Sequence, residues 1–200
     1  MKSGKVILNL SLLLLFFVGP LIAAWWLFAN TKVWTGSTVN TGQLIQPTLN
    51  FAQLKLNNTN GTLLDVKPMR GHWVMLYLLP KANCDKECLD NLYKMRQVRT
   101  ALGKNRERVQ RLVVTFAEQS PPQLASLLSK EYVGTVQGVI AKNAGLQFFA
   151  HTPLPPIALQ QGSLYLVDPL GNIMMAYQAD FAPKNLLKDL GRLLSTSQIG

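Results

Sequence analysis

Residues 73–88 read WVMLYLLPKANCDKEC, an apolar run that leads through a short loop to two cysteines. The run Trp73–Leu79 is continuously apolar, which is typical of a strand buried on both faces of a sheet. Cys84 and Cys88 are the only cysteines of the chain, and two cysteines placed at random in a chain of this length would stand four apart about one time in a hundred. The spacing therefore predicts that the two sulfur atoms act as a pair.

A helix is predicted over Asp85–Leu102, because its apolar residues recur at intervals of three and four. Residues four apart at the start of a helix share one face, so the two sulfurs can hold one soft metal ion or close into a disulfide. The unpaired N–H groups and the positive end of the helix dipole are expected to lower the pKa of both thiols, and so are Lys81 and Lys86.

The rest of the chain predicts further strands and helices in alternation. Strands are expected at Arg111–Phe116, Leu164–Val167 and Ile173–Tyr177, and helices at Pro121–Tyr132 and Pro183–Leu194. The segment 133–149 is ambiguous. This order predicts an α/β fold, a thioredoxin-like sandwich in which helices flank a central mixed sheet.

The N-terminal segment 6–28 is almost entirely apolar and predicts one transmembrane helix, because it is long enough to cross a hydrocarbon core of about 30 Å. Lys2 and Lys5 favour a cytoplasmic N-terminus, residues 1–5, with export of the domain beyond the helix. A cleaved signal peptide is the alternative, but Trp25 and Trp26 are typical of a retained anchor at the membrane interface.

After the predicted anchor, the polar composition of residues 29–49 predicts a linker. The thioredoxin-like domain is then expected at 50–196, with a tail at 197–200. The net charge of +10 comes largely from basic residues between Lys81 and Arg111. Their spacing fits the solvated face of one helix. An acidic protein or the membrane surface is the alternative partner for these residues, and no nucleic acid is expected as partner of an exported domain.

Several of these motifs together resemble the Sco/SenC family of membrane-anchored copper-delivery proteins. The resemblance lies in the order of Gly71–Val74, the following strand, Cys84-x-x-x-Cys88, the helix carrying Met95-Arg96, and Arg108–Gln110. Further on, residues 165–171, YLVDPLG, are similar to that family's closing strand and turn, so the resemblance extends over about 51–194.

The resemblance implies a thioredoxin-like fold, the inner membrane of an aerobic bacterium, and a domain in the periplasm. It also implies a part in maturing the dinuclear copper centre of cytochrome c oxidase, with the copper-bearing oxidase subunit as partner. Cys84 and Cys88 would then hold Cu(I), and the family adds a histidine just before the closing strand.

Gln160 or Gln161 stands at that histidine's position here, and amide side chains are poor ligands for soft copper. His151 lies a few residues upstream and is the candidate third ligand, with a solvent-facing loop histidine as the alternative. His72 is expected to be structural and Asp168 to be a turn residue.

Three functions stay open at this point, and whether the chain is an enzyme stays open with them. The first is an assembly factor that binds Cu(I) or keeps the thiols of the oxidase subunit reduced. The second is a general membrane-tethered thiol-disulfide oxidoreductase with Cys84 and Cys88 as its catalytic redox pair. The third is a non-catalytic interaction domain whose cysteines form a structural disulfide.

Overall fold

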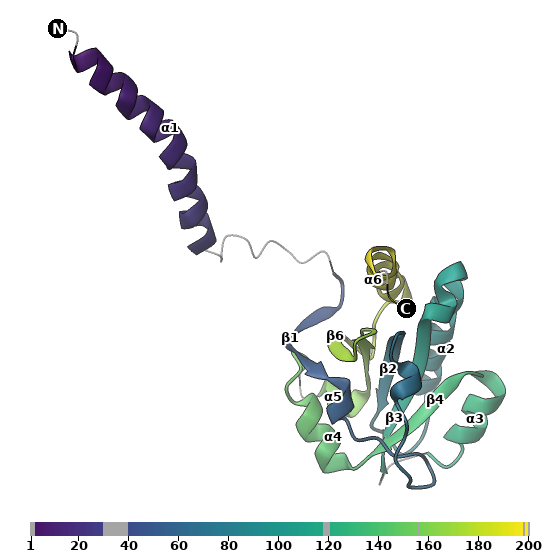
Figure 1. Cartoon of the computed structure of the whole chain (residues 1–200). Helices are drawn as coiled ribbons and strands as arrows, with labels where there is room; N and C mark the ends of the chain where they lie inside the picture. The colour runs from purple at the N-terminus through teal and green to yellow at the C-terminus, as the bar shows by residue number, and fades with distance from the viewer. Residues whose placement is uncertain (1–2, 30–39, 118–120, 156, 198, 200) are drawn as a thin grey trace. The chain divides into compact units, whose positions relative to one another are not determined.

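The computed structural model describes residues 3–29, 40–117, 121–155, 157–197 and 199 (Figure 1). The chain divides into two compact units, Met1–Val39 and Asn40–Gly200. The first unit contains the helix α1 (Ser3–Ala29), in which Asn9–Ala29 is long and apolar enough to cross a membrane. This helix contains the whole of segment 6–28, for which the sequence predicts a membrane span.

The second unit is built on a mixed sheet of six strands in the order β1-β6-β5-β2-β3-β4. Strands β2, β3 and β4 run parallel, whereas β5 lies antiparallel to β2, and β6 is antiparallel to both β5 and β1. The strands are β1 (Gln43–Asn50), β2 (Trp73–Leu79), β3 (Val109–Phe116), β4 (Thr135–Ile140), β5 (Ser163–Val167) and β6 (Asn172–Gln178).

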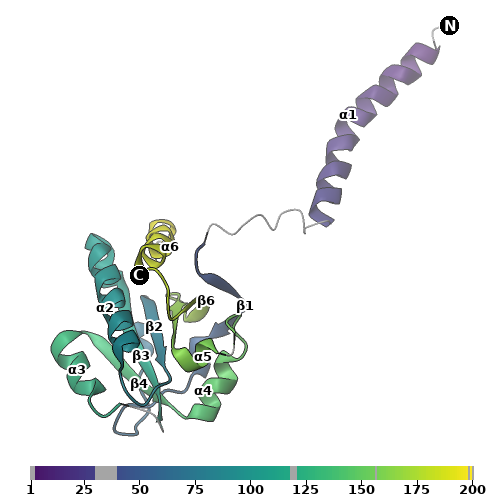
Figure 2. The ribbon, with the colours of Figure 1, turned by 180° about the vertical axis from the view of Figure 1, so that it is seen from behind.

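Helices cover both faces of this sheet, as Figures 1 and 2 show from opposite sides. Alternate residues of β2 point into two separate apolar clusters, which is why the whole strand is apolar. One cluster is closed by α2 (Lys86–Ala101), α3 (Leu124–Glu131) and α6 (Pro183–Thr196), and the other by α4 (Lys142–Phe149) and α5 (Ala158–Gln161). The predicted thioredoxin-like sandwich is confirmed.

Short 3-10 helices complete the connections between these elements. They are η2 (Phe51–Gln53), η3 (Lys67–Met69) and η4 (Gly103–Arg108). The segment 133–149, ambiguous from sequence, forms β4 and then α4.

Strand β1 (Gln43–Asn50) overlaps the C-terminal part of residues 29–49, for which the sequence predicts a linker. Its side chains are mostly exposed and only Ile45 is buried in the core, because β1 is an edge strand paired on one side with β6. An edge strand of this kind lacks the apolar alternation on which sequence-based prediction depends. The compact unit accordingly begins at Asn40 rather than at residue 50.

The start of β1 is held by Asp189 of α6, which is only 1% exposed. Its Oδ2 accepts hydrogen bonds from Thr41 N (2.9 Å), Thr41 Oγ1 (2.6 Å), Gly42 N (3.0 Å) and the Tyr177 hydroxyl (2.8 Å). Burial alone would raise the pKa of this carboxyl, but these hydrogen bonds outweigh burial and lower the pKa below its usual value. Asp189 therefore ties the beginning of the domain to its last helix.

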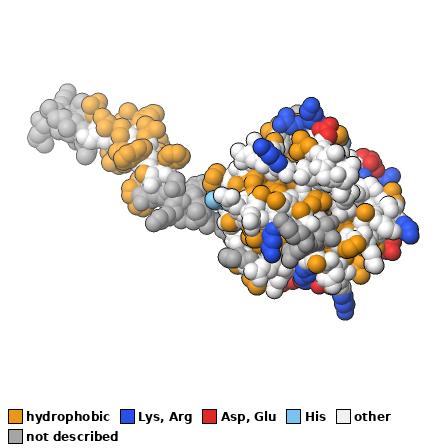
Figure 3. All heavy atoms as spheres, turned by 90° about the horizontal axis from the view of Figure 1, so that it is seen from below, with side chains coloured by type: hydrophobic (Ala, Val, Ile, Leu, Met, Phe, Trp, Pro, Cys, Tyr) orange, Lys and Arg blue, Asp and Glu red, His pale blue; other side chains and the backbone are white. Residues whose placement is uncertain are grey.

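The basic side chains do not form one continuous patch on the face seen in Figure 3, where several lie beside acidic ones. Arg99 and Arg106 both pair with Glu107, and Arg108 donates to the carbonyl oxygens of Leu194 and Ser197. Several basic side chains between 81 and 111 are thus paired with a neighbouring carboxylate or hydrogen-bonded to backbone carbonyl oxygens.

Candidate functional site

The two cysteines lie at the edge of the sheet where β2 ends and α2 begins. β2 and β3 run parallel, so the carboxyl ends of both strands lie at this end of the sheet, and the loop after β2 carries Cys84 toward the start of α2. Cys84 and Cys88 are joined by a disulfide, with their Cα atoms 5.1 Å apart. Cys84 is half-buried, whereas Cys88 is 1% exposed and belongs to the core under α2. An approaching thiol can therefore reach Cys84 more easily than Cys88.

The start of α2 is fixed by Asp85, which caps the helix. Asp85 Oδ1 accepts the backbone N–H of Cys88 at 3.0 Å, one of the N–H groups that a helix leaves unpaired at its start. Lys81 Nζ lies 2.8 Å from Asp85 Oδ2 and 2.6 Å from Glu87 Oε2. The Lys81 hydrogen bond and the Cys88 N–H lower the pKa of the Asp85 carboxyl, and the two carboxylates raise the pKa of Lys81.

This arrangement bears on the expectation that Lys81 lowers the pKa of the thiols, which stays a prediction. Its charge is matched by two carboxylates at hydrogen-bonding distance, so little of its field is left for the sulfur atoms. The other nearby cation, Lys86, is exposed to solvent, which screens it. The start of α2, with its dipole and unpaired N–H groups, is the remaining source of thiolate stabilisation.

Two hollows adjoin this helix start. The apolar groove, as we name it, has a volume of about 430 Å³ and is lined by Ala82, Asn83, Cys84, Leu89, Pro121, Pro122, Gln123, Leu124 and Leu127. The acidic hollow, as we name it, has about 600 Å³ and is lined by Asp85, Lys86, Glu87, Asp90, Lys94, Ala179 and Asp180. Cys84 therefore lines an uncharged groove, and the residue that follows it, Asp85, lines a charged hollow.

The structure does not bring His151 together with the cysteines. His151 is exposed and follows α4, which packs on the face of the sheet opposite to α2. Within the described part of the chain, no group of three or more His, Cys, Asp or Glu side chains is placed to hold a metal ion. The three-residue ligand set considered from sequence is thus not assembled in this conformation.

The position of the family's histidine does lie at the cysteine edge of the sheet. Ser163 of β5 is opposite Leu78 of β2, so the residues just before β5 are close to the end of β2. Gly162 stands there with a φ of +102°, and a Cβ added to it would lie 3.3 Å from the Leu78 carbonyl oxygen. Gln160 and Gln161 precede it and are exposed.

A buried polar pair under the helix start was not predicted from the sequence. Asn91 Nδ2 donates to the Tyr77 hydroxyl at 3.5 Å, and both side chains are buried. Burial raises the pKa of Tyr77 to about 12, so the hydroxyl stays protonated. Asn91 lies one turn beyond Cys88 on the apolar side of α2, and a polar residue at such a position was the signal that could have revealed the pair.

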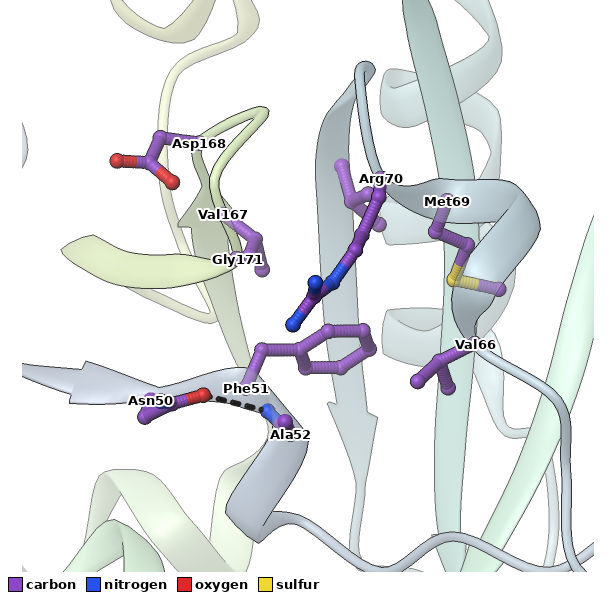
Figure 4. Close-up of a pocket in the computed structure, with 10 residues that line it drawn as sticks. Asn50, Phe51, Ala52, Val66, Met69, Arg70, Val167, Asp168 and Gly171 are labelled. Atoms are coloured by element: carbon purple, nitrogen blue, oxygen red, sulfur yellow. Dashed lines mark hydrogen bonds between the residues drawn. The ribbon is translucent and has the colours of Figure 1, made fainter.

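The opposite end of the sheet carries no comparable site among the described residues. Asp168 Oδ1 accepts the N–H groups of Leu170 and Asn172, so Asp168 is a turn residue as expected. The hollow beside it, shown in Figure 4 with Arg70 extended over Phe51, has a volume of only about 20 Å³, room for about one water molecule. His72 lies half-buried at this end, just before β2.

Solved structures of Sco proteins share this fold. Copper-bound yeast Sco1 is 18% identical, with a TM-score of 0.55 over 81% of this chain and 96% of that one. Apo Sco1 from Thermus thermophilus is 18% identical, with a TM-score of 0.58 over 79% and 99%. BsSco, described as a Sco-family cytochrome c oxidase assembly protein with a disulfide switch, is 14% identical, with a TM-score of 0.50 over 79% and 97%.

A search of curated protein sequences gave no match. A family model, by contrast, covers residues 73–197, from the first residue of β2 to just beyond the end of α6. That range includes the disulfide, both hollows and every strand of the sheet except β1. Since the match extends over more than half of the sequence, the chain belongs to the family described as "Transmembrane-like, thioredoxin-like, C-terminal domain".

Proposed function

We propose that this chain is a membrane-anchored, Sco-like assembly factor for cytochrome c oxidase that exchanges thiols through Cys84 and Cys88. The observation that carries the proposal is the disulfide at the start of α2, with one accessible and one buried sulfur. The motif resemblance to Sco proteins and the shared fold support it. BsSco is described as a member of a family of cytochrome c oxidase assembly proteins, and we extend that role to this chain.

In the proposed reaction, the reduced chain acts on a disulfide of the copper-bearing oxidase subunit. The thiolate of Cys84 attacks one sulfur of that disulfide, which forms a mixed disulfide and releases the other sulfur as a thiolate. Cys88 then attacks the Cys84 sulfur, so that the subunit leaves as a dithiol and the chain ends as the disulfide that the structure describes. Two electrons pass to the subunit, and a second exported dithiol protein must return them.

The reduced pair can also carry Cu(I) as cargo, because two thiolates are the ligands that this soft ion prefers. Two sulfurs leave the ion without a third ligand from the described residues, since His151 lies apart from them. We propose that a ligand from the oxidase subunit completes the coordination during transfer. This makes His151 dispensable for copper uptake.

We further propose that α1 is retained as the anchor in a bacterial inner membrane, with the N-terminus in the cytoplasm. The unit Asn40–Gly200 then lies in the periplasm, close to a membrane-embedded oxidase. The basic residues before the apolar stretch support this orientation. Fusing a reporter enzyme that is active only in the periplasm to the C-terminus tests it, and an inactive fusion would contradict it.

A general thiol-disulfide oxidoreductase is the second candidate. It is favoured by the two-sulfur site, in which the described residues offer no third metal ligand. Insulin separates the two candidates: reduction of insulin as fast as reduction of the oxidase subunit's soluble domain supports the general enzyme. Much faster reduction of the oxidase domain supports the assembly factor.

The deciding experiment uses the full chain in detergent micelles. We expect the pair to equilibrate with dithiothreitol while the chain stays folded, at a potential above the roughly −300 mV below which structural disulfides typically lie. Anaerobic titration with Cu(I) should give one ion per reduced chain, lost in Cys84→Ser and in Cys88→Ser. A disulfide that is reduced only when the domain unfolds would refute the proposal, and Cu(I) uptake that persists in both serine variants would refute its copper part.

A further inference from the structure

We propose that the surface around Cys84 selects cysteine-bearing segments with apolar residues on one side of the cysteine and a basic residue on the other. This inference rests on the proposed thiol exchange and names the kind of partner segment that it serves. Cys84 lines the apolar groove, and Asp85, the next residue of the chain, lines the acidic hollow, so the two surfaces adjoin at the reactive cysteine and differ in character. A partner segment that extends on both sides of the sulfur bound to Cys84 can therefore contact both surfaces.

The apolar groove supplies the first half of the recognition. Cys84 is part of its wall, and no charged side chain is among the described residues that line it. Leu89 of α2 is 40% exposed beside it, although Leu is a residue that helices normally turn toward the core. Pro121 and Pro122 also line the groove, and proline fixes the backbone and removes its N–H donors, so this part of the lining is both stiff and apolar.

Covering such a groove removes apolar surface from water, which stabilises an apolar occupant. Asn83 and Gln123 also line it, and their amides can pair with the backbone of an extended segment. These features fit a short apolar stretch of an extended chain, held next to the sulfur that it delivers.

The acidic hollow supplies the second half through charge complementarity. Four carboxylates and two lysines line it. Lys81 adds a third cation by bridging two of the carboxylates, and Lys94 lies 2.7 Å from Asp90. Four carboxylates against three cations leave one excess negative charge over the hollow as a whole, in a chain whose net charge is +10, and Asp180 is an exposed carboxylate of its lining. A lysine or arginine of the partner segment fits this position, whereas an acidic residue is repelled.

The test measures how fast Cys84 of the full-length Cys88→Ser variant, in detergent micelles, reacts with peptides carrying thionitrobenzoate on their single cysteine. The Cys84 thiolate forms a disulfide with the peptide, and the released thionitrobenzoate is read by its absorbance. The first probe pair is Leu-Val-Cys-Lys and its reverse, each acetylated and amidated. Control peptides replace Leu-Val with Ser-Ser, or Lys with Glu. Each rate is divided by the rate with free dithionitrobenzoate, which corrects for thiolate reactivity.

We expect at least one orientation of the apolar, basic peptide to react about tenfold faster than its Ser-Ser control, and the Glu peptide to be the slowest. Leu89→Gln should remove most of the apolar preference, and Asp180→Lys should reverse the charge preference. The matched control is Leu170→Gln, because Leu170 is 68% exposed in the turn after β5, at the opposite end of the sheet. It should leave both preferences intact.

Equal rates with the apolar and Ser-Ser peptides would overturn the groove's role, and equal rates with Lys and Glu would overturn the hollow's role. An apolar preference that persists in Leu89→Gln would also overturn the groove's role. Failure of the proposed function gives a different result: if Cys84 does not exchange thiols, it reacts with neither the peptides nor free dithionitrobenzoate while the chain is folded.

Discussion

Replacing Asp189 by alanine should unfold the domain at a much lower temperature, because Asp189 is the shared acceptor of the contacts that hold β1. The change leaves the buried N–H of Gly42 without its acceptor and leaves the buried Tyr177 hydroxyl with only the weaker acceptor Met175 Sδ, 3.0 Å away. Each such loss costs about 1–3 kcal/mol, so about 3 kcal/mol is expected from these two donors. The donors of Thr41 are only partly buried and can turn to water, so they add less. For a domain of this size the loss corresponds to a fall in Tm of about 6–12 °C.

The measurement is thermal and urea unfolding of the full chain in detergent, with Asp180→Ala as the control. Asp180 is also an aspartate near α6 but is exposed, so its loss should change the free energy of unfolding by less than about 0.5 kcal/mol. Asp189→Asn, which keeps an acceptor oxygen but not the charge, should fall between the two. A change below about 0.5 kcal/mol in Asp189→Ala would refute the argument.

The pH dependence gives an independent check of the same argument. The pKa of Asp189 is lower in the folded than in the unfolded chain, so the folded state favours the ionised carboxylate. Its contribution to stability is fully present above the unfolded pKa of about 4 and is lost as the pH falls through the lower folded pKa. The difference between wild type and Asp189→Asn should therefore shrink below about pH 4. A difference that stays constant down to about pH 2 would show that charge is not involved.

Three further changes test the site and its frame. Gly162→Ala should destabilise the domain by about 3 kcal/mol, because the φ of +102° at this position disfavours side chains and the new Cβ would lie 2.9 Å from the Tyr77 hydroxyl. Gly191→Ala in α6 is the control: the position has open space around it, so the substitution should raise Tm slightly. Asp85→Ala should cost about 1 kcal/mol through the lost helix cap and should make the unfolding midpoint less sensitive to acid, since the pKa of Asp85 is lowered in the fold. His151→Ala should leave Cu(I) stoichiometry unchanged, and loss of the ion in this variant would restore His151 as a ligand.

The sequence predicts the central strands well because their burial is symmetric. β2 is covered on both faces, so its residues must all be apolar, and a continuous apolar run needs no knowledge of its partners. The same holds for β3 and β5, which are buried along nearly their whole length. The helix α2 can be predicted from sequence for a related reason, because its buried residues share one side and its capping residue, Asp85, directly precedes the helix.

The edge strand β1 and its attachment could not be predicted from local pattern. β1 is stabilised by backbone hydrogen bonds to β6 and by Asp189, which is about 150 positions away along the chain. A buried aspartate on an amphipathic helix looks like any solvent-facing acid until its partners are known. Contacts of this kind depend on the fold as a whole, and no window of the sequence contains both partners.

The chemistry of the cysteine pair depends on how charge is distributed around it. The sequence places Lys81 near both sulfurs. In the fold, Lys81 forms ion pairs with Asp85 and Glu87, and Asp85 also caps the start of α2. The charge of Lys81 is thus paired at the start of the helix from which Cys88 projects. A thiolate at Cys84 then depends mainly on the helix dipole, which is a weaker effect than a direct ion pair. A moderate thiol pKa in Cys88→Ser, raised little or not at all when Lys81 is also changed to Met, would fit this distribution of charge. A pKa that rises by more than about one unit in the Lys81→Met variant would contradict it, because Lys81 would then act on the sulfur directly.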